Sequence, residues 1–175
     1  HYGIGLFDAD EEHQISISDK FLTWGWRDPE RKQVKEMGLF TKLSQKKYRR
    51  NGGLLIVTTN MNRYSYRMFS FPIAGQWHKY HADQKNLVKN LLINIKSKTI
   101  IRLVKNDYGR EEAKRWETEF PEIDIDKGRV RINKIYKNNR LIVHTYNATS
   151  YLETLALNYP TIIFWDEKLW EIRPE

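Results

Sequence analysis

Residues 139–165, NRLIVHTYNATSYLETLALNYPTIIFW, contain the signals for a strand, a polar turn, a helix and a second strand in one short stretch. The run Leu141–Val143 is apolar and rich in β-branched residues, which is typical of a strand that a parallel sheet buries on both faces. This strand is predicted to end at His144. A polar turn follows at residues 145–150, and in it Asn147 or Thr149 is expected to cap the next helix.

Apolar side chains then recur at helical spacing until Pro160 ends the helix. Residues 161–165 predict a second buried strand, so the whole stretch is predicted to form a βαβ unit. Ligands of open α/β sheets bind beyond the carboxyl ends of the strands, where a helix N-terminus attracts anions. Most βαβ units are nevertheless only scaffold, and the unit by itself favours that interpretation.

The chain from residue 54 onward repeats the alternation of strand and helix. The expected strands are 54–58, 99–104 and 123–125, and the expected helices are 79–95 and 111–120. Residues 131–138 favour neither structure. Such alternation predicts the α/β class, with a Rossmann-like parallel sheet that carries helices on both faces. Before it, only 21–24 resembles a strand, and the basic stretch 45–50 is typical of a linker or exposed turn.

The net charge of the chain indicates the kinds of partner that it can bind. The formal net charge is +8 with a pI near 9.5, so phosphate-bearing partners are expected: a nucleotide, a nucleic acid or anionic lipid headgroups. The chain has no cysteine, which excludes disulfides and thiolate metal sites. No apolar run reaches the length of a membrane span, and the first residues do not resemble a signal peptide. Because the chain begins with His1 rather than Met, it is expected to be a piece of a longer protein.

Three predicted strands end in polar loops, at residues 58–64, 105–109 and 144–150. The carboxyl ends of parallel strands share one edge of a sheet, so these loops are expected to converge there. A cationic edge beside a helix N-terminus suits a diphosphate, and Glu153 could accept hydrogen bonds from ribose hydroxyls or be merely a capping or solvent-facing residue. The candidate ligand-binding residues are Thr59, Asn60, Arg63, Arg102, Lys105, His144, Asn147, Thr149, Ser150 and Glu153.

The sequence lacks the motifs of several common kinds of binding and catalytic site. The sequence has neither a GxGxxG dinucleotide fingerprint nor a GxxxxGK[ST] phosphate loop. It has no HExxH or comparable histidine pairing for a metal and no GxSxG nucleophile elbow. No metal and no cofactor is therefore predicted.

Four segments resemble one known family: HYGIG at 1–5, EHQISISDKFLTWGW at 12–26, LLIVTTNMNRY at 54–64 and RLIVHTYNATSYLETLALNYPTIIFW at 140–165. The family comprises bacterial transferases of surface-carbohydrate and lipopolysaccharide biosynthesis, which are similar to glycosyltransferases of the two-Rossmann GT-B architecture. The resemblance implies that residues 1–48 are the tail of an N-terminal Rossmann-like domain and its linker. Residues 49–175 would then be the domain that binds a nucleotide-sugar donor.

The resemblance also assigns roles to residues. Asn147, Thr149 and Ser150 would lie near the donor phosphates, and Glu153 near the hydroxyls of the sugar or ribose. His1 matches the end of a His-Gly loop in which the histidine acts as the base for the acceptor, although Tyr2 stands where related enzymes have Gly. Positive groups would stabilise the leaving phosphate without a metal.

The expected function is therefore transfer of a sugar from a nucleotide-activated donor to a surface-polysaccharide or lipopolysaccharide acceptor. The acceptor is expected to be a glycan or lipid-linked glycan, and the location to be cytoplasmic, at the inner face of an anionic membrane. Two alternatives remain open: a basic nucleic-acid-binding module, and an α/β interaction domain without catalysis. No RNA- or DNA-binding motif favours the first alternative, and its densest basic cluster is 45–50.

Overall fold

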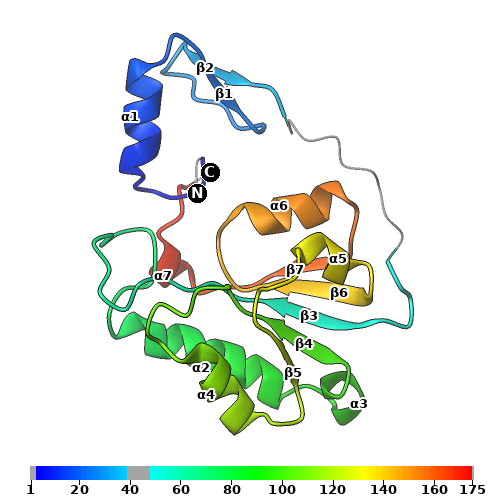
Figure 1. Ribbon diagram of the computed structural model, residues 1–175. Coiled ribbons are helices and arrows are strands. Elements are labelled where there is room, and N and C mark those ends of the chain that lie inside the picture. Colours follow the sequence, from blue (N-terminus) through cyan, green and yellow to red (C-terminus); the bar gives the residue numbers. More distant parts are fainter. Residues whose placement is uncertain (1–2, 39–47, 175) are drawn as a thin grey trace.

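A computed structural model describes residues 3–38 and 48–174 (Figure 1). The strands are β1 Phe21–Thr23, β2 Val34–Glu36, β3 Gly53–Val57, β4 Thr99–Arg102, β5 Asp124–Asp126, β6 Asn139–His144 and β7 Thr161–Ile163. The helices are α1 Ala9–Ile17, α2 Gln76–Lys89, α3 Ile93–Lys96, α4 Glu112–Glu119, α5 Ile132–Tyr136, α6 Thr149–Ala156 and α7 Glu167–Trp170. In the part of the chain described, no helix is both long and apolar enough to cross a membrane.

Strands β3 to β7 form one parallel sheet in the order β5-β4-β3-β6-β7. From β3 the chain first adds β4 and β5 on one side and then returns to add β6 and β7 on the other. The direction of winding therefore reverses between β3 and β6. This is the Rossmann-like α/β arrangement that the alternating sequence pattern predicted.

Side chains of β3 alternate between two cores. Leu54 and Ile56 pack with Trp116 against α2 and α4, whereas Leu55 and Val57 pack with Tyr136 on the opposite face. Figure 1 shows α5 and α6 on this second face of the sheet and α2 and α4 on the first. Because both faces are covered, the central strands could be recognised as continuous apolar runs.

One helical prediction was wrong, and one segment that the sequence left unassigned is helical. The single helix expected over 79–95 is interrupted: α2 ends at Lys89, and α3 begins only at Ile93. At the break the side chain of Asn90 donates to the Asn86 carbonyl at 2.7 Å, and Leu92 has an extended backbone. Side chains such as that of asparagine compete with the helical backbone in this way. Residues 131–138, which the sequence left unassigned, contain α5.

The second strand of the βαβ unit is not buried as expected. Strand β7 lies at the edge of the sheet and pairs only with β6. Its residues Ile162 and Ile163 are 48% and 39% exposed. Apolar composition alone could not distinguish this edge from a central strand.

Residues 3–38 form a separate part with α1 and the two-stranded parallel sheet of β1 and β2. The C-terminal tail returns to this part: Gly5 bridges Ile172 in antiparallel fashion, and the Arg173 N–H donates to the Ile4 carbonyl at 2.9 Å. The predicted domain boundary at residue 48 adjoins residues 39–47, which lie outside the described residues. The boundary itself stays a prediction.

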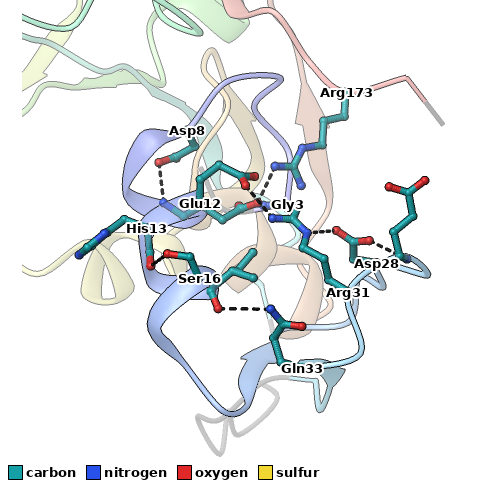
Figure 2. A network of polar contacts seen from close by, with 12 residues as sticks. Gly3, Asp8, Glu12, His13, Ser16, Asp28, Arg31, Gln33 and Arg173 are labelled. Atoms are coloured by element: carbon teal, nitrogen blue, oxygen red, sulfur yellow. Dashed lines mark hydrogen bonds and ion pairs between the residues drawn. The ribbon is translucent and has the colours of Figure 1, made fainter.

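A buried ion pair accompanies this return. The guanidinium of Arg173 bonds the carboxylate of Glu11, which is 0% exposed and also accepts the Gly3 N–H. Figure 2 shows Arg173 directed toward Gly3 beside α1, with Arg31 close to Glu12 and Asp28. Arg31 bonds Glu12 at 2.7 Å and Asp28 at 2.5 Å, which ties α1 to the segment before β2.

Replacing Arg173 should destabilise the chain. We expect Arg173→Gln to lower the free energy of unfolding by about 2 kcal/mol, because it leaves the Glu11 carboxylate buried without its cation. The loss is smaller than for a sealed pair, since the Arg173 side chain is 27% exposed. Urea unfolding measures it. The matched control is Arg27→Gln, which removes the exposed partner of Glu36 and should change nothing measurable. Equal effects of the two variants would contradict the prediction.

Candidate functional site

The loops that follow β3, β4 and β6 meet at the carboxyl edge of the sheet, as expected. The Asn60 amide donates to the Asp107 carbonyl at 2.7 Å, and the Arg63 N–H donates to the Tyr108 carbonyl at 3.4 Å. The hydroxyl of Tyr80 connects the loop after β3 with the loop after β6, because it accepts the Thr59 N–H at 3.1 Å and lies 2.9 Å from the Thr145 hydroxyl. Hydrogen bonds between residues that are distant in sequence therefore fix the loops to one another.

The N-terminus of α6 lies at the point where the winding of the sheet reverses. Its N-cap is Ala148, and no side chain of the described residues caps it, so the prediction that Asn147 or Thr149 would do so was wrong. The helix begins one residue later than a cap at Asn147 requires, and the Asn147 side chain is instead fully buried. Within residues 3–38 and 48–174, neither its amide nitrogen nor its oxygen has a hydrogen-bond partner. A buried amide without partners is costly and is rarely found without a reason.

His144 lies beneath this turn and is fully buried. Its Nε2 is 3.1 Å from the Thr154 hydroxyl and its Nδ1 is 3.1 Å from the Ser150 hydroxyl, which also bonds Tyr146 at 2.9 Å. Burial lowers the pKa of His144 to about 4, so the ring is neutral near pH 7. His144 therefore positions Ser150, and both of its ring nitrogens already face protein hydroxyls.

Arg102 and Glu153 lie near Tyr146 on the α5 and α6 face. Arg102 forms an ion pair with Asp126 of the neighbouring strand, so its charge is largely matched. Burial raises the pKa of Tyr146, the charge of Glu153 adds to that effect, and the charge of Arg102 opposes it. The Glu153 side chain is exposed to solvent, but the protein around it removes enough water to raise the pKa of its carboxyl. Thr149 is also exposed, whereas Ser150 is half-buried.

A fourth loop, residues 127–131 after β5, was not among the candidates. Gly128 has a φ of +75°, and a Cβ there would lie 2.5 Å from the Lys105 nitrogen. The loop therefore presses directly against Lys105. The two loops share a hollow of about 320 Å³ with Asn60, Lys127 and Arg129 in its lining. A glycine between basic residues after a short strand was the signal for this loop.

The structure thus divides the candidate residues among three places. Asn147, Thr149, Ser150 and Glu153 belong to the α6 turn, Arg102 borders them, and Asn60 and Lys105 line the hollow beside the β5 loop. Arg63 lies apart, in a hollow of about 380 Å³ between α2 and α4. Thr59 points its N–H at Tyr80, and His1 lies outside the described residues.

One larger hollow lies at the opposite edge. Its volume is about 570 Å³, and Arg50, Lys98 and Arg140 are in its lining. These residues stand near the amino ends of β3, β4 and β6, away from the exit loops. The position is unlike that of ligands in open α/β sheets.

The fold and the edge define an α/β protein whose sheet reverses its winding beside a helix N-terminus and an unpartnered buried amide. The family model described as LIC12162 family transferase matches residues 1–175. The chain therefore belongs to the LIC12162 family of transferases and is identified as a transferase on that ground. No curated protein and no solved structure matches it.

The neutral, buried His144 should make folding acid-sensitive. Its pKa falls from 6.5 in the unfolded chain to about 4 in the folded chain, so the unfolded chain takes up a proton first as the pH falls. Between pH 6.5 and about pH 4 this residue should cost about 3 kcal/mol of stability. In His144→Phe that part of the loss should disappear. Urea unfolding of both proteins across this pH range measures it, and parallel curves would contradict the assignment.

Proposed function

We propose that this chain is the donor-binding part of a glycosyltransferase. In this proposal it binds a nucleotide-activated sugar beside the N-terminus of α6 and transfers the sugar to a surface-polysaccharide or lipopolysaccharide acceptor. The observation that carries the proposal is the Asn147 amide at the point where the sheet reverses its winding, because it is buried and has no partner among the described residues. Membership of a transferase family supports the reaction class.

The chemistry of the turn suits a phosphate. The first backbone N–H groups of α6 have no side-chain cap, so they are available to an anion together with the positive end of the helix dipole. Asn147 can donate through its nitrogen, and Ser150 can contribute its hydroxyl. These groups would hold the donor phosphates and stabilise the negative charge that develops on the leaving group.

Glu153 is placed one turn further along α6 and is exposed, so its carboxylate can accept hydrogen bonds from sugar or ribose hydroxyls. Arg129 of the loop 127–131 and Lys105 flank the same edge and would add positive charge near the nucleotide. Arg102, held by Asp126, would act through Tyr146 rather than as a free cation.

The GT-B architecture belongs to the same proposal. Residues 3–38, with a sheet of their own, would be the remainder of an N-terminal domain that supplies the acceptor side of the cleft. His1 would serve there as the base that removes the proton from the acceptor hydroxyl. The acceptor would be a glycan or lipid-linked glycan at an anionic membrane surface.

Nucleotide titration tests the donor site. We expect one member of a panel of nucleoside diphosphates and their sugar conjugates to bind, as followed by calorimetry. Asn147→Ala and Glu153→Gln should each weaken that binding by about tenfold or more, because each removes hydrogen bonds to a charged or hydroxylated ligand. The matched control Glu167→Gln changes an exposed carboxylate on α7 and should leave the affinity unchanged.

If no nucleotide or nucleotide sugar produces heat, or if both variants bind as the parent chain does, the donor proposal is overturned. Binding to single-stranded oligonucleotides with a steep salt dependence, without binding of free nucleotides, would favour the nucleic-acid alternative instead.

A further inference from the structure

The hollow between α2 and α4 gathers positive side chains at the carboxyl edge. Its volume is about 380 Å³, and its lining includes Arg63, Trp77, His78, His81, Arg110 and Arg115. Arg63 comes from the loop after β3, the histidines from α2, and the other two arginines from the start of α4 and the loop before it. None of these residues belongs to the α6 turn.

Arg110 is held in a fixed position. Its guanidinium stacks on the ring of Trp77, with its carbon 4.2 Å from the ring centroid. Its Nε donates to the Met61 carbonyl at 2.8 Å and its Nη2 to the Asn62 carbonyl at 3.3 Å. These neutral acceptors orient the guanidinium without cancelling its charge, and among the described residues no hydrogen bond uses its Nη1. An arginine so arranged is prepared to bind an oxyanion.

The positive charge of the hollow is not matched by ion pairs. Within the described ranges, neither Arg63 nor Arg110 nor Arg115 has a carboxylate within the 4.0 Å of a salt bridge. The nearby carboxylate of Asp107 instead accepts the N–H groups of Glu111 and Glu112, both at 2.9 Å. Asp107 is therefore occupied with the start of α4.

A second acid beside the hollow, Glu112, is buried and uncharged. Glu112 is 3% exposed, and its Oε1 lies 3.4 Å from Nε2 of His81 without making a hydrogen bond. Burial raises the pKa of Glu112 to about 8 and lowers that of His81 to about 4. Near pH 7 both groups are neutral, so Glu112 does not offset the charge of the three arginines.

We propose that this hollow is a second anion site, which binds a phosphate or diphosphate group and is separate from the donor site at α6. Three planar guanidinium groups from three segments match the several oxygens and the double charge of a phosphate better than the two oxygens of a carboxylate. The phosphate can belong to a free anion or to a lipid headgroup. Exposed Tyr64 and Tyr66, at 87% and 90%, lie on the loop that supplies Arg63, where they suit contact with a lipid surface.

The indole N–H of Trp77 provides a local measurement. Its NMR signal, assigned from its absence in Trp77→Phe, should shift saturably when sodium pyrophosphate is added to the complete chain. The double variant Arg63→Gln/Arg115→Gln should weaken this response by about tenfold or more, because two charge-assisted contacts are lost. Arg110 is left unchanged because it holds the loop.

The controls separate this site from general charge and from the donor site. Arg50→Gln/Arg140→Gln removes the same charge at the opposite edge of the sheet and should retain the shift. Asn147→Ala and Glu153→Gln should also retain it, so failure of the donor proposal and failure of this one are distinguishable. An absent shift, an unchanged Arg63→Gln/Arg115→Gln, or an equal loss in Arg50→Gln/Arg140→Gln would overturn the proposal.

Sedimentation with vesicles distinguishes the source of the phosphate. If the group is a lipid headgroup, the chain should sediment with phosphatidylcholine vesicles that contain phosphatidic acid, pyrophosphate should release it, and Arg63→Gln/Arg115→Gln should stay in solution. If the group is a free anion, the Trp77 signal should respond to pyrophosphate while the chain does not sediment with these vesicles. Vesicle binding that survives Arg63→Gln/Arg115→Gln and pyrophosphate would contradict a lipid-phosphate site in this hollow.

Discussion

The parallel pairing of β3 with strands on both sides is the constraint on which the rest of the structure depends. The start of β3 lies between the backbone segments at Lys98 and at Asn138, which leave no room for a side chain. A Cβ at Gly53 would lie 1.9 Å from the Lys98 carbonyl oxygen, and one at Gly52 would lie 2.5 Å from the Asn138 carbonyl oxygen. Two glycines therefore allow the central strand to enter, and every exit loop at the far edge is positioned as a result.

The side chains of β3 alternate between the two faces of the sheet, so each face has its own core. Tyr80 of α2 bonds both the loop after β3 and the loop after β6, so the two faces share one rigid edge. One side of that edge carries the uncapped start of α6, and the other carries the arginine hollow between α2 and α4. Two places suited to anions can thus exist on one sheet without sharing a side chain.

The central strands were predictable because burial on both faces makes each of them a continuous apolar run. The helix break at Asn90, the exposed edge strand β7 and the short α5 were not, since each depends on competition or coverage that local composition does not record. The exit loops were also predictable as positions along the chain. Which face each side chain would join was not, because this is decided by distant contacts such as that of Arg110 with Met61.

The distribution of ion pairs explains why net charge alone was a poor guide to the site. A net charge of +8 suggests positive potential over much of the surface. In the loop after β5, however, Lys127 is matched by Glu117 of α4 at 2.6 Å. On the α5 and α6 side, Arg102 is matched by Asp126. There an anion would depend mainly on backbone N–H groups and the Asn147 amide. In the α2 and α4 hollow the arginines are unmatched and the buried Glu112 is neutral, so Coulomb attraction would dominate. The two places should therefore differ in salt dependence, since screening weakens exposed charges far more than hydrogen bonds at a half-buried turn.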